Sequence, residues 1–144
     1  MKAVIQRVIR AAVRVDGVTT GEIGRGYLVL LGVADGDGRE EADRILRKMV
    51  NLRIFPDEAG KINLSLGDVD GQLLIVSQFT LCADTSRGNR PSFVYAAPPE
   101  KANELYEYFI AKARECVPVV QTGSFGADMK VELVNDGPFT IILE

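Results

Sequence analysis

Apolar and polar residues alternate along the first fifteen positions of the chain. A period of two is typical of a half-buried strand, so we expect a strand over residues 2–15. The Asp16-Gly17 pair that follows is a strong hairpin-turn signal. Residues 18–24 then lead back toward an apolar strand at 27–34. The pattern predicts a meander of strands in the first quarter of the chain.

Two later stretches repeat apolar residues every three or four positions, which is the spacing of an amphipathic helix. The first lies between residues 38 and 52, and its stripe consists of Ala42, Ile45, Leu46, Met49 and Val50. The second follows Pro98-Pro99 and stops at Pro118, and its stripe consists of Ala102, Leu105, Phe109, Ala113 and Cys116. We therefore predict two main amphipathic helices.

Apolar runs at 72–80, 128–135 and 139–143 predict further strands. No internal repeat, low-complexity tract or linker interrupts the pattern, so residues 1–144 are expected to form a single domain. The expected fold class is α/β, with a mostly antiparallel, barrel-like sheet and the two helices. The order of the strands stays open.

Length and composition agree with one hydrophobic core. The chain has 144 residues and is 47% hydrophobic, and a domain of this length buries roughly 68–70% of its unfolded surface. No apolar run reaches the roughly 18 residues that a membrane span requires, and the alternating N-terminal segment does not resemble a signal peptide. We expect a cytoplasmic protein with no membrane contact. Cys82 and Cys116 are expected to be buried, reduced thiols.

The formal charge of −3 argues against a protein that coats a long track of nucleic acid. Any RNA contact should be local, and no DNA partner is expected. Three clusters of basic residues could supply such a contact, although each is more commonly a solvated face. They are Arg7, Arg10 and Arg14; Arg44, Arg47, Lys48 and Arg53; and Arg87 with Arg90.

The absence of histidine narrows the chemistry most. It excludes Ser-His-Asp and Cys-His hydrolases and disfavours a catalytic zinc, so we expect no metal and no cofactor. No phosphate-binding P-loop is present, and the glycines at 21, 24 and 26 precede a strand, which favours turn positions. The carboxylates fall in turns and on polar helix faces, and we assign them no catalysis.

Two segments look more constrained than their local structure requires. Residues 77–81, with the sequence SQFTL, place hydroxyl groups at the end of an apolar strand, although a strand that turns polar at the surface looks the same. Residues 135–140, with the sequence NDGPFT, are expected to form a turn between two strands.

The chain resembles the bacterial D-aminoacyl-tRNA deacylases along essentially its whole length. The resemblance depends on the order and spacing of blocks that are individually weak. These blocks are IQRV at 5–8, VDG at 15–17, GEIG at 21–24, RIFPDEAGKINLS at 53–65, SQFTL at 77–81, RGNRPSF at 87–93, QTGSFGADM at 121–129 and NDGPFT at 135–140. One departure is Phe139, where the family usually has valine, and it affects the packing behind the turn.

The resemblance implies a homodimer with shared active sites that acts in chiral proofreading of aminoacyl-tRNA. In the family, the SQFTL segment of one subunit meets the Gly-Pro turn of the other, and the Gly-Pro peptide is cis. The carbonyl oxygens of that turn would leave no space for an L side chain, whereas D-amino acids and glycine, including glycine mischarged on tRNA(Ala), would be accepted. Arg7 is our candidate for holding the turn. The implied substrate-binding residues are Ser77, Gln78, Phe79, Thr80, Gly137 and Pro138.

Two mechanisms remain open without histidine. Thr80 could be a nucleophile, but a threonine hydroxyl requires a neighbouring base and the sequence offers no evident one. Alternatively, the pocket orients the ester, backbone N–H groups of Phe79 and Thr80 stabilise the oxyanion, and the ribose 2′-hydroxyl of the tRNA assists water.

Two other functions also remain open. The chain could be a non-enzymatic nucleic-acid-binding dimer of the same fold, although its acidic charge argues against this. It could also be a structural dimer that has lost activity, for which Phe139 would be the first residue to suspect.

Overall fold

The computed structural model describes residues 1–144, and its central element is the 14-residue strand β1 (Lys2–Val15). Along one edge, β1 pairs first with β3 (Gly26–Gly32) and then with β2 (Val18–Ile23), both antiparallel. Along its other edge it pairs with β8 (Lys130–Leu143), also antiparallel. The expected meander is therefore wrong, because β1 is long enough to bind β2 and β3 on successive halves of one edge.

The sheet then curls toward a barrel. β6 (Gln72–Ser77) pairs with β3, and β7 (Val120–Thr122) pairs in turn with β6; both pairings are parallel. The strand order is therefore β2-β1-β3-β6-β7, and β8 pairs with β1. β2 comes back against β7, where a Cβ at Gly21 would lie 2.4 Å from the Thr122 carbonyl oxygen. Gly21 thus permits close packing inside a strand and is not the turn residue that we expected. The mostly antiparallel, barrel-like α/β fold is confirmed.

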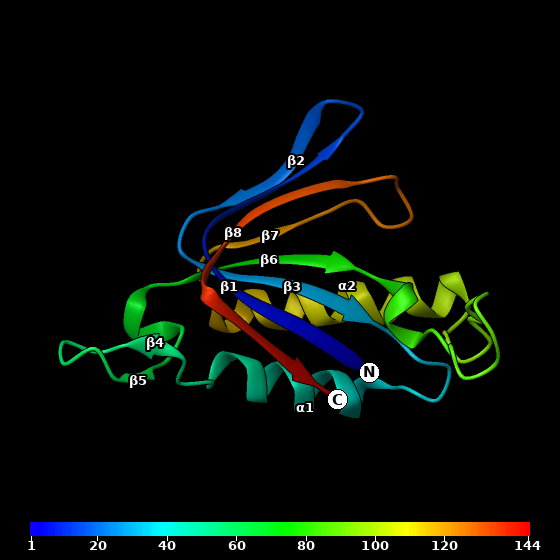
Figure 1. Cartoon of the computed structure of the whole chain (residues 1–144), viewed down its shortest axis with the longest axis horizontal. Helices are drawn as coiled ribbons and strands as arrows, with labels where there is room; N and C mark the ends of the chain where they lie inside the picture. The colour runs from blue at the N-terminus through cyan, green and yellow to red at the C-terminus, as the bar shows by residue number, and fades with distance from the viewer.

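The two predicted helices, α1 (Arg39–Val50) and α2 (Pro99–Cys116), lie side by side on one face of the sheet (Figure 1). Their apolar stripes are buried in a core cluster of 25 residues, with Tyr106 and Ile110 added to the stripe of α2. The prediction that both cysteines are buried is wrong: the last turn of α2 leaves Cys116 exposed, and Cys82 is only half-buried. Burial still raises the pKa of the Cys82 thiol, so this thiol is not activated.

β8 is one continuous strand, which corrects the prediction of two strands joined by a turn. Asn135 pairs with Val8 and Thr140 pairs with Gln6, so residues 136–139 bulge outward opposite the single residue Arg7. The chain does not reverse here because both halves of β8 remain antiparallel to β1. The NDGPFT segment is therefore a wide bulge on the strand.

Several shorter elements complete the chain. After α1, the hairpin of β4 (Phe55–Pro56) and β5 (Ile62–Leu64) projects at the left of Figure 1, followed by the 3-10 turn η1 (Gly67–Val69). A second 3-10 turn, η2 (Phe79–Cys82), follows β6. None of the helices has both the length and the apolar character needed to cross a membrane.

Candidate functional site

The SQFTL segment leaves the sheet earlier than we predicted. β6 ends at Ser77, and the chain then turns into η2, so the expected strand over 72–80 is three residues too long. The Gln78 N–H still donates to the Leu31 carbonyl at 2.8 Å, and the Leu81 N–H then donates to the Gln78 carbonyl at 3.2 Å. The backbone thus changes from sheet hydrogen bonding to 3-10 turn hydrogen bonding at Gln78, and this change leaves Phe79 at the surface.

A cavity of about 660 Å³ opens beside this switch. Its walls come from the end of β6, the start of α2 and the loop before β8, and eleven of its 17 lining residues are hydrophobic. The predicted residues Ser77, Gln78 and Phe79 line it, whereas Thr80 does not. A mostly apolar cavity with a few polar groups is the usual form of a small-molecule site.

Aromatic side chains form one wall of the cavity. Phe79 is 53% exposed and packs edge-to-face against Phe93, with 5.0 Å between the ring centroids. Phe125 lines the same cavity. An exposed aromatic ring at a cavity mouth offers a flat apolar surface to a ligand. Sequence reasoning gave Phe93 and Phe125 no role, although both lie in the blocks RGNRPSF and QTGSFGADM.

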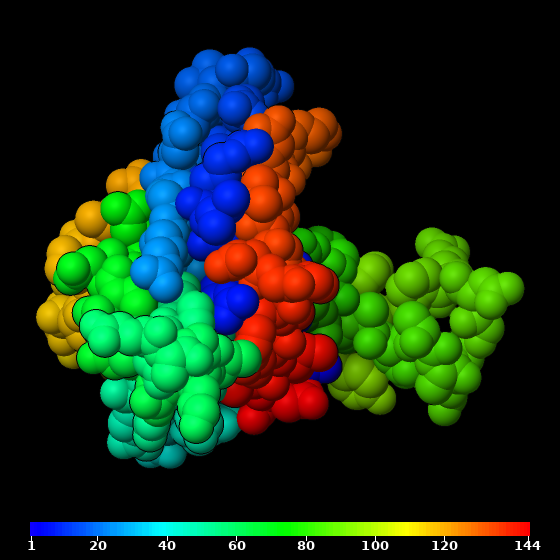
Figure 2. Space-filling model, turned by 60° about the vertical axis from the view of Figure 1, so that its left-hand side comes forward, coloured from blue at the N-terminus to red at the C-terminus, as the bar shows by residue number.

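The loop that carries Phe93 projects from the molecule, as the yellow-green segment of Figure 2 shows. Two backbone hydrogen bonds between Asp84 and Ser92, at 2.8 and 2.9 Å, close this loop just before Phe93. Arg87 and Arg90 lie on this loop and are exposed. The loop therefore presents two exposed cations in the segment that precedes Phe93.

The cavity contains almost no titratable chemistry. Asp128 is its only titratable lining residue, and that exposed carboxylate is paired with Lys130 at 2.8 Å. Behind the cavity, burial raises the pKa of Tyr106 to about 12, and its hydroxyl donates to the Ile75 carbonyl at 2.8 Å. At neutral pH this phenol stays protonated. The walls thus present no free general base.

Thr80 is exposed on η2, and its hydroxyl accepts a hydrogen bond from the Gln78 side-chain amide. An amide N–H cannot remove a proton from a hydroxyl. The local contacts therefore orient Thr80 without activating it as a nucleophile.

The second predicted segment lies elsewhere in the subunit. Gly137 and Pro138 sit at the exposed crest of the β8 bulge, their peptide bond is cis, and neither lines the cavity. Within one chain, the structure therefore does not bring the SQFTL segment and the Gly-Pro segment together.

Arg7 supports the bulge from below. The residue is 8% exposed, its Nε donates to the Asp136 carbonyl at 3.0 Å, and its Nη1 donates to the Ile54 carbonyl at 2.6 Å. The expectation that Arg7 holds the 135–140 segment through one of its carbonyls is met at Asp136, and the second hydrogen bond goes to the segment after α1. Arg7 thereby ties this segment to the bulge.

Phe139 packs against Arg7 behind the bulge. The Arg7 guanidinium lies over the Phe139 ring, with 4.7 Å from Cζ to the ring centroid, and the Phe139 N–H donates to the Asn135 side chain at 2.8 Å. A cation over an aromatic face is attracted to it. Phe139 therefore contributes to the packing behind the bulge.

Comparison with known proteins gives consistent matches over the full length. The family model described as D-Tyr-tRNA(Tyr) deacylase matches residues 4–144. A protein of Geotalea uraniireducens (strain Rf4) named D-aminoacyl-tRNA deacylase is 64% identical over 144 residues, which cover 100% of this chain and 93% of that protein.

Two solved structures share the fold. A protein named c-Myc DNA Unwinding Element Binding Protein is 45% identical, has a TM-score of 0.95, and is matched over 100% of this chain and 98% of its own. A probable eukaryotic D-amino acid tRNA deacylase is 20% identical, with a TM-score of 0.84, and is matched over 99% of this chain and 97% of its own. The second likeness concerns the fold alone.

Proposed function

The chain belongs to the D-Tyr-tRNA(Tyr) deacylase family, and on this premise we propose that it removes D-amino acids, and also glycine, from the acceptor end of tRNA. Water adds to the ester carbonyl, the bond to the ribose oxygen breaks, and that oxygen leaves with a proton. The products are the free amino acid and an uncharged tRNA. The observation that carries the proposal is the full-length identity of 64% to a D-aminoacyl-tRNA deacylase. Because the substrate is charged tRNA, the enzyme would work in the cytoplasm.

The cavity beside β6 is the proposed site for the aminoacylated end. Its aromatic wall of Phe79 and Phe93 suits the flat base of a terminal nucleoside, and the polar groups of Ser77 and Gln78 lie at the same edge. This placement makes the SQFTL segment a binding surface for the reacting ester.

We propose that the active enzyme is a homodimer in which the Gly137-Pro138 segment of one subunit enters the cavity of the other. Two features support this. Gly137 and Pro138 are exposed and lie outside their own cavity. β8 pairs only with β1, so one of its edges is open, and Ile142 on it is 60% exposed. A second copy of the chain would cover both the exposed Gly137-Pro138 segment and the open edge of β8.

In that arrangement the carbonyl oxygens of Gly137 and Pro138 act as a filter. They press against the α-carbon of the bound aminoacyl group from the side where an L residue carries its side chain. A D side chain points elsewhere and is accepted. The site thereby spares the large pool of correctly charged L-aminoacyl-tRNA.

The catalytic proposal is that the pocket orients the ester while the substrate supplies part of the chemistry. The cavity walls lack a free base, and the Thr80 hydroxyl has only an amide partner. Backbone N–H groups of Phe79 and Thr80, which begin η2, would stabilise the oxyanion, and the terminal 2′-hydroxyl would assist water. Removing one such donor typically costs about 10²–10³ in rate.

Replacing Thr80 by alanine should therefore retain much of the activity, because the substitution keeps the backbone N–H and deletes only the hydroxyl. A substrate whose terminal ribose is 2′-deoxy should instead be turned over at least about a hundredfold more slowly. Single-turnover rates of the two proteins on the two substrates give the comparison. An inactive Thr80→Ala enzyme, together with full wild-type turnover of the 2′-deoxy substrate, would overturn RNA-assisted catalysis.

The activity itself is tested by incubating the purified protein with D-tyrosyl-tRNA and with L-tyrosyl-tRNA and following ester loss. We expect rapid loss of the D ester and none of the L ester above the uncatalysed rate. A second candidate function, a non-enzymatic nucleic-acid-binding dimer, is favoured by the 45% identity to a protein named for binding a DNA unwinding element. It predicts that both esters survive while the protein binds nucleic acid.

A further inference from the structure

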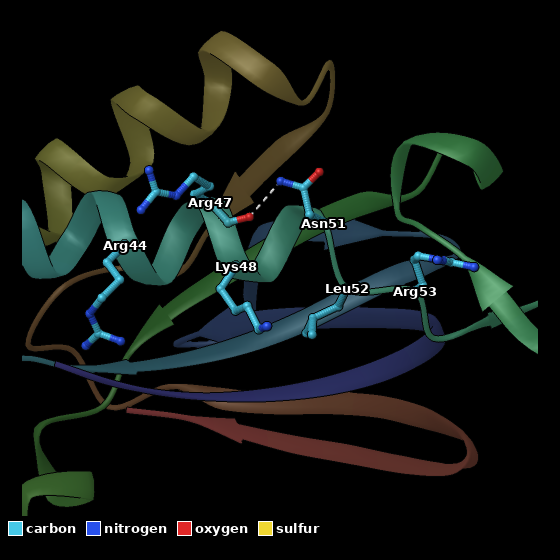
Figure 3. Close-up of a pocket in the computed structure, with 6 residues that line it drawn as sticks. All are labelled: Arg44, Arg47, Lys48, Asn51, Leu52 and Arg53. Atoms are coloured by element: carbon cyan, nitrogen blue, oxygen red, sulfur yellow. Dashed lines mark hydrogen bonds between the residues drawn. The ribbon is translucent and has the colours of Figure 1, made fainter.

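Four basic residues gather at the C-terminal end of α1. Arg44, Arg47, Lys48 and Arg53 line a shallow cavity of about 440 Å³ together with Asn51 and Leu52. We call these four cations the basic patch. Figure 3 shows Arg44 and Lys48 extending from the same side of α1, with Arg53 beyond the end of the helix. No carboxylate lines this cavity, although the chain has 20 acidic residues against 17 basic ones.

The cations of the basic patch are not neutralised within the chain. None of them belongs to an ion pair. Arg44 donates to the Glu144 main-chain oxygen and Arg53 to Asn63, while the side chains of Arg47 and Lys48 have no hydrogen-bond partner. All four are exposed. The patch is therefore available to an anion with several charges.

The basic patch lies close to the segment that supports the Gly137-Pro138 element. Arg53 directly precedes Ile54, whose carbonyl accepts the 2.6 Å hydrogen bond from Arg7, and Arg7 also donates to Asp136 beside the Gly137-Pro138 segment. Arg53, at one end of the patch, is thus adjacent to the segment that Arg7 ties to the element that we place in the partner's cavity. In the dimer, each patch would flank the mouth of the site that its own subunit completes.

We propose that the basic patch binds the sugar–phosphate backbone of the tRNA while the aminoacylated end occupies the cavity. This inference rests on the proposed deacylase function. Phosphate contacts of this kind position an RNA without reading its sequence, and each releases counterions when it forms. An enzyme with net charge −3 requires such a local patch, because its surface as a whole repels RNA.

A competing explanation is purely structural. Arg47 and Lys48 lie in the last turn of α1, where cations stabilise the negative end of the helix dipole. That role predicts a loss of stability when they are neutralised, and no change in RNA affinity. Arg114 is exposed in the last turn of α2 and has the same relation to its own helix. It is therefore a matched control.

The test compares Arg47→Gln/Lys48→Gln with Arg114→Gln. For the patch variant we expect a KM for D-tyrosyl-tRNA raised roughly five- to twentyfold at an unchanged kcat. The slope of log Kd against log salt for uncharged tRNA should correspond to roughly two to four phosphate contacts in the wild type and fall by about one to two in the variant. Arg114→Gln should match the wild type in both measurements.

A patch variant with wild-type KM and salt slope would overturn the inference. So would a variant with a lowered Tm and reduced kcat, because that pattern indicates the structural role. Turnover of D-tyrosyl-adenosine, which carries no phosphate, should be equal in the variant and the wild type. Failure of the deacylase proposal would be visible separately, as wild-type protein that leaves D-tyrosyl-tRNA intact.

Discussion

Mixing Gly137→Val subunits with Phe79→Ala subunits is expected to restore about a quarter of the wild-type activity, although each variant alone should be inactive. Random pairing makes about half of the dimers mixed, and one of the two sites in each mixed dimer then combines an intact cavity with an intact turn. The expected recovery follows only if each site takes its two halves from different subunits. Activity after the two proteins are co-refolded at equal concentrations is the measurement.

The two substitutions damage opposite halves of the proposed site. Gly137 has a φ of +133°, and a Cβ there would lie 3.1 Å from the Arg7 Nη2 and 3.2 Å from the Phe139 nitrogen, so valine displaces the bulge. Phe79→Ala removes the exposed ring that forms the cavity wall with Phe93. Neither Gly137 nor Phe79 belongs to the buried core cluster, so both proteins should fold.

The matched control mixes Gly137→Val with Pro138→Gly, two variants of the same element, and should show no recovery. Sedimentation must confirm that mixed dimers have formed. Mixed dimers without activity, or a fully active monomer, would contradict the shared site.

The helices and the first hairpin could be predicted from sequence because their signals are local. The apolar stripe of α1 repeats with the period of a helix. In the first hairpin, the Asp16-Gly17 pair marks the turn between β1 and β2 directly. The parallel pairing of β3 with β6 leaves no comparable local signal, because its partners are more than 40 residues apart in the chain. The order of the strands therefore became visible only in the structure.

The residues of the candidate site also divide into those that a local sequence pattern marks and those that it does not. Arg7 occupies a core-facing position of the alternating strand β1, and a buried cation at such a position is a sequence signal that something polar must satisfy it. Phe93 and Phe125 lie in irregular loops, where an aromatic residue has no periodic pattern to mark it. The bulge of β8 was misread as a reversal because Asp-Gly-Pro is a common turn sequence, whereas the pairing with β1 resumes at Thr140.

Glycyl-tRNA should be hydrolysed at a rate similar to that of D-alanyl-tRNA, whereas L-alanyl-tRNA should be spared. The filter proposed for Gly137 and Pro138 acts by excluding an L side chain, and glycine has no side chain to exclude. Positive recognition of a D side chain would predict the opposite rank for glycine. The three deacylation rates, measured on the same tRNA so that RNA contacts cancel, separate the two forms of selectivity.

The ratio of the D-alanyl to the L-alanyl deacylation rate is as informative as the rank of the three substrates. Hydrophobic contact with one methyl group discriminates by only about 10- to 200-fold, so favourable contact alone cannot protect L-alanine by more than this. A rigid turn that clashes with the methyl can discriminate further, and we expect a ratio of D-alanyl to L-alanyl rates above roughly 200. Glycine protected as well as L-alanine in the wild type would show that the Gly137-Pro138 segment does not work by exclusion.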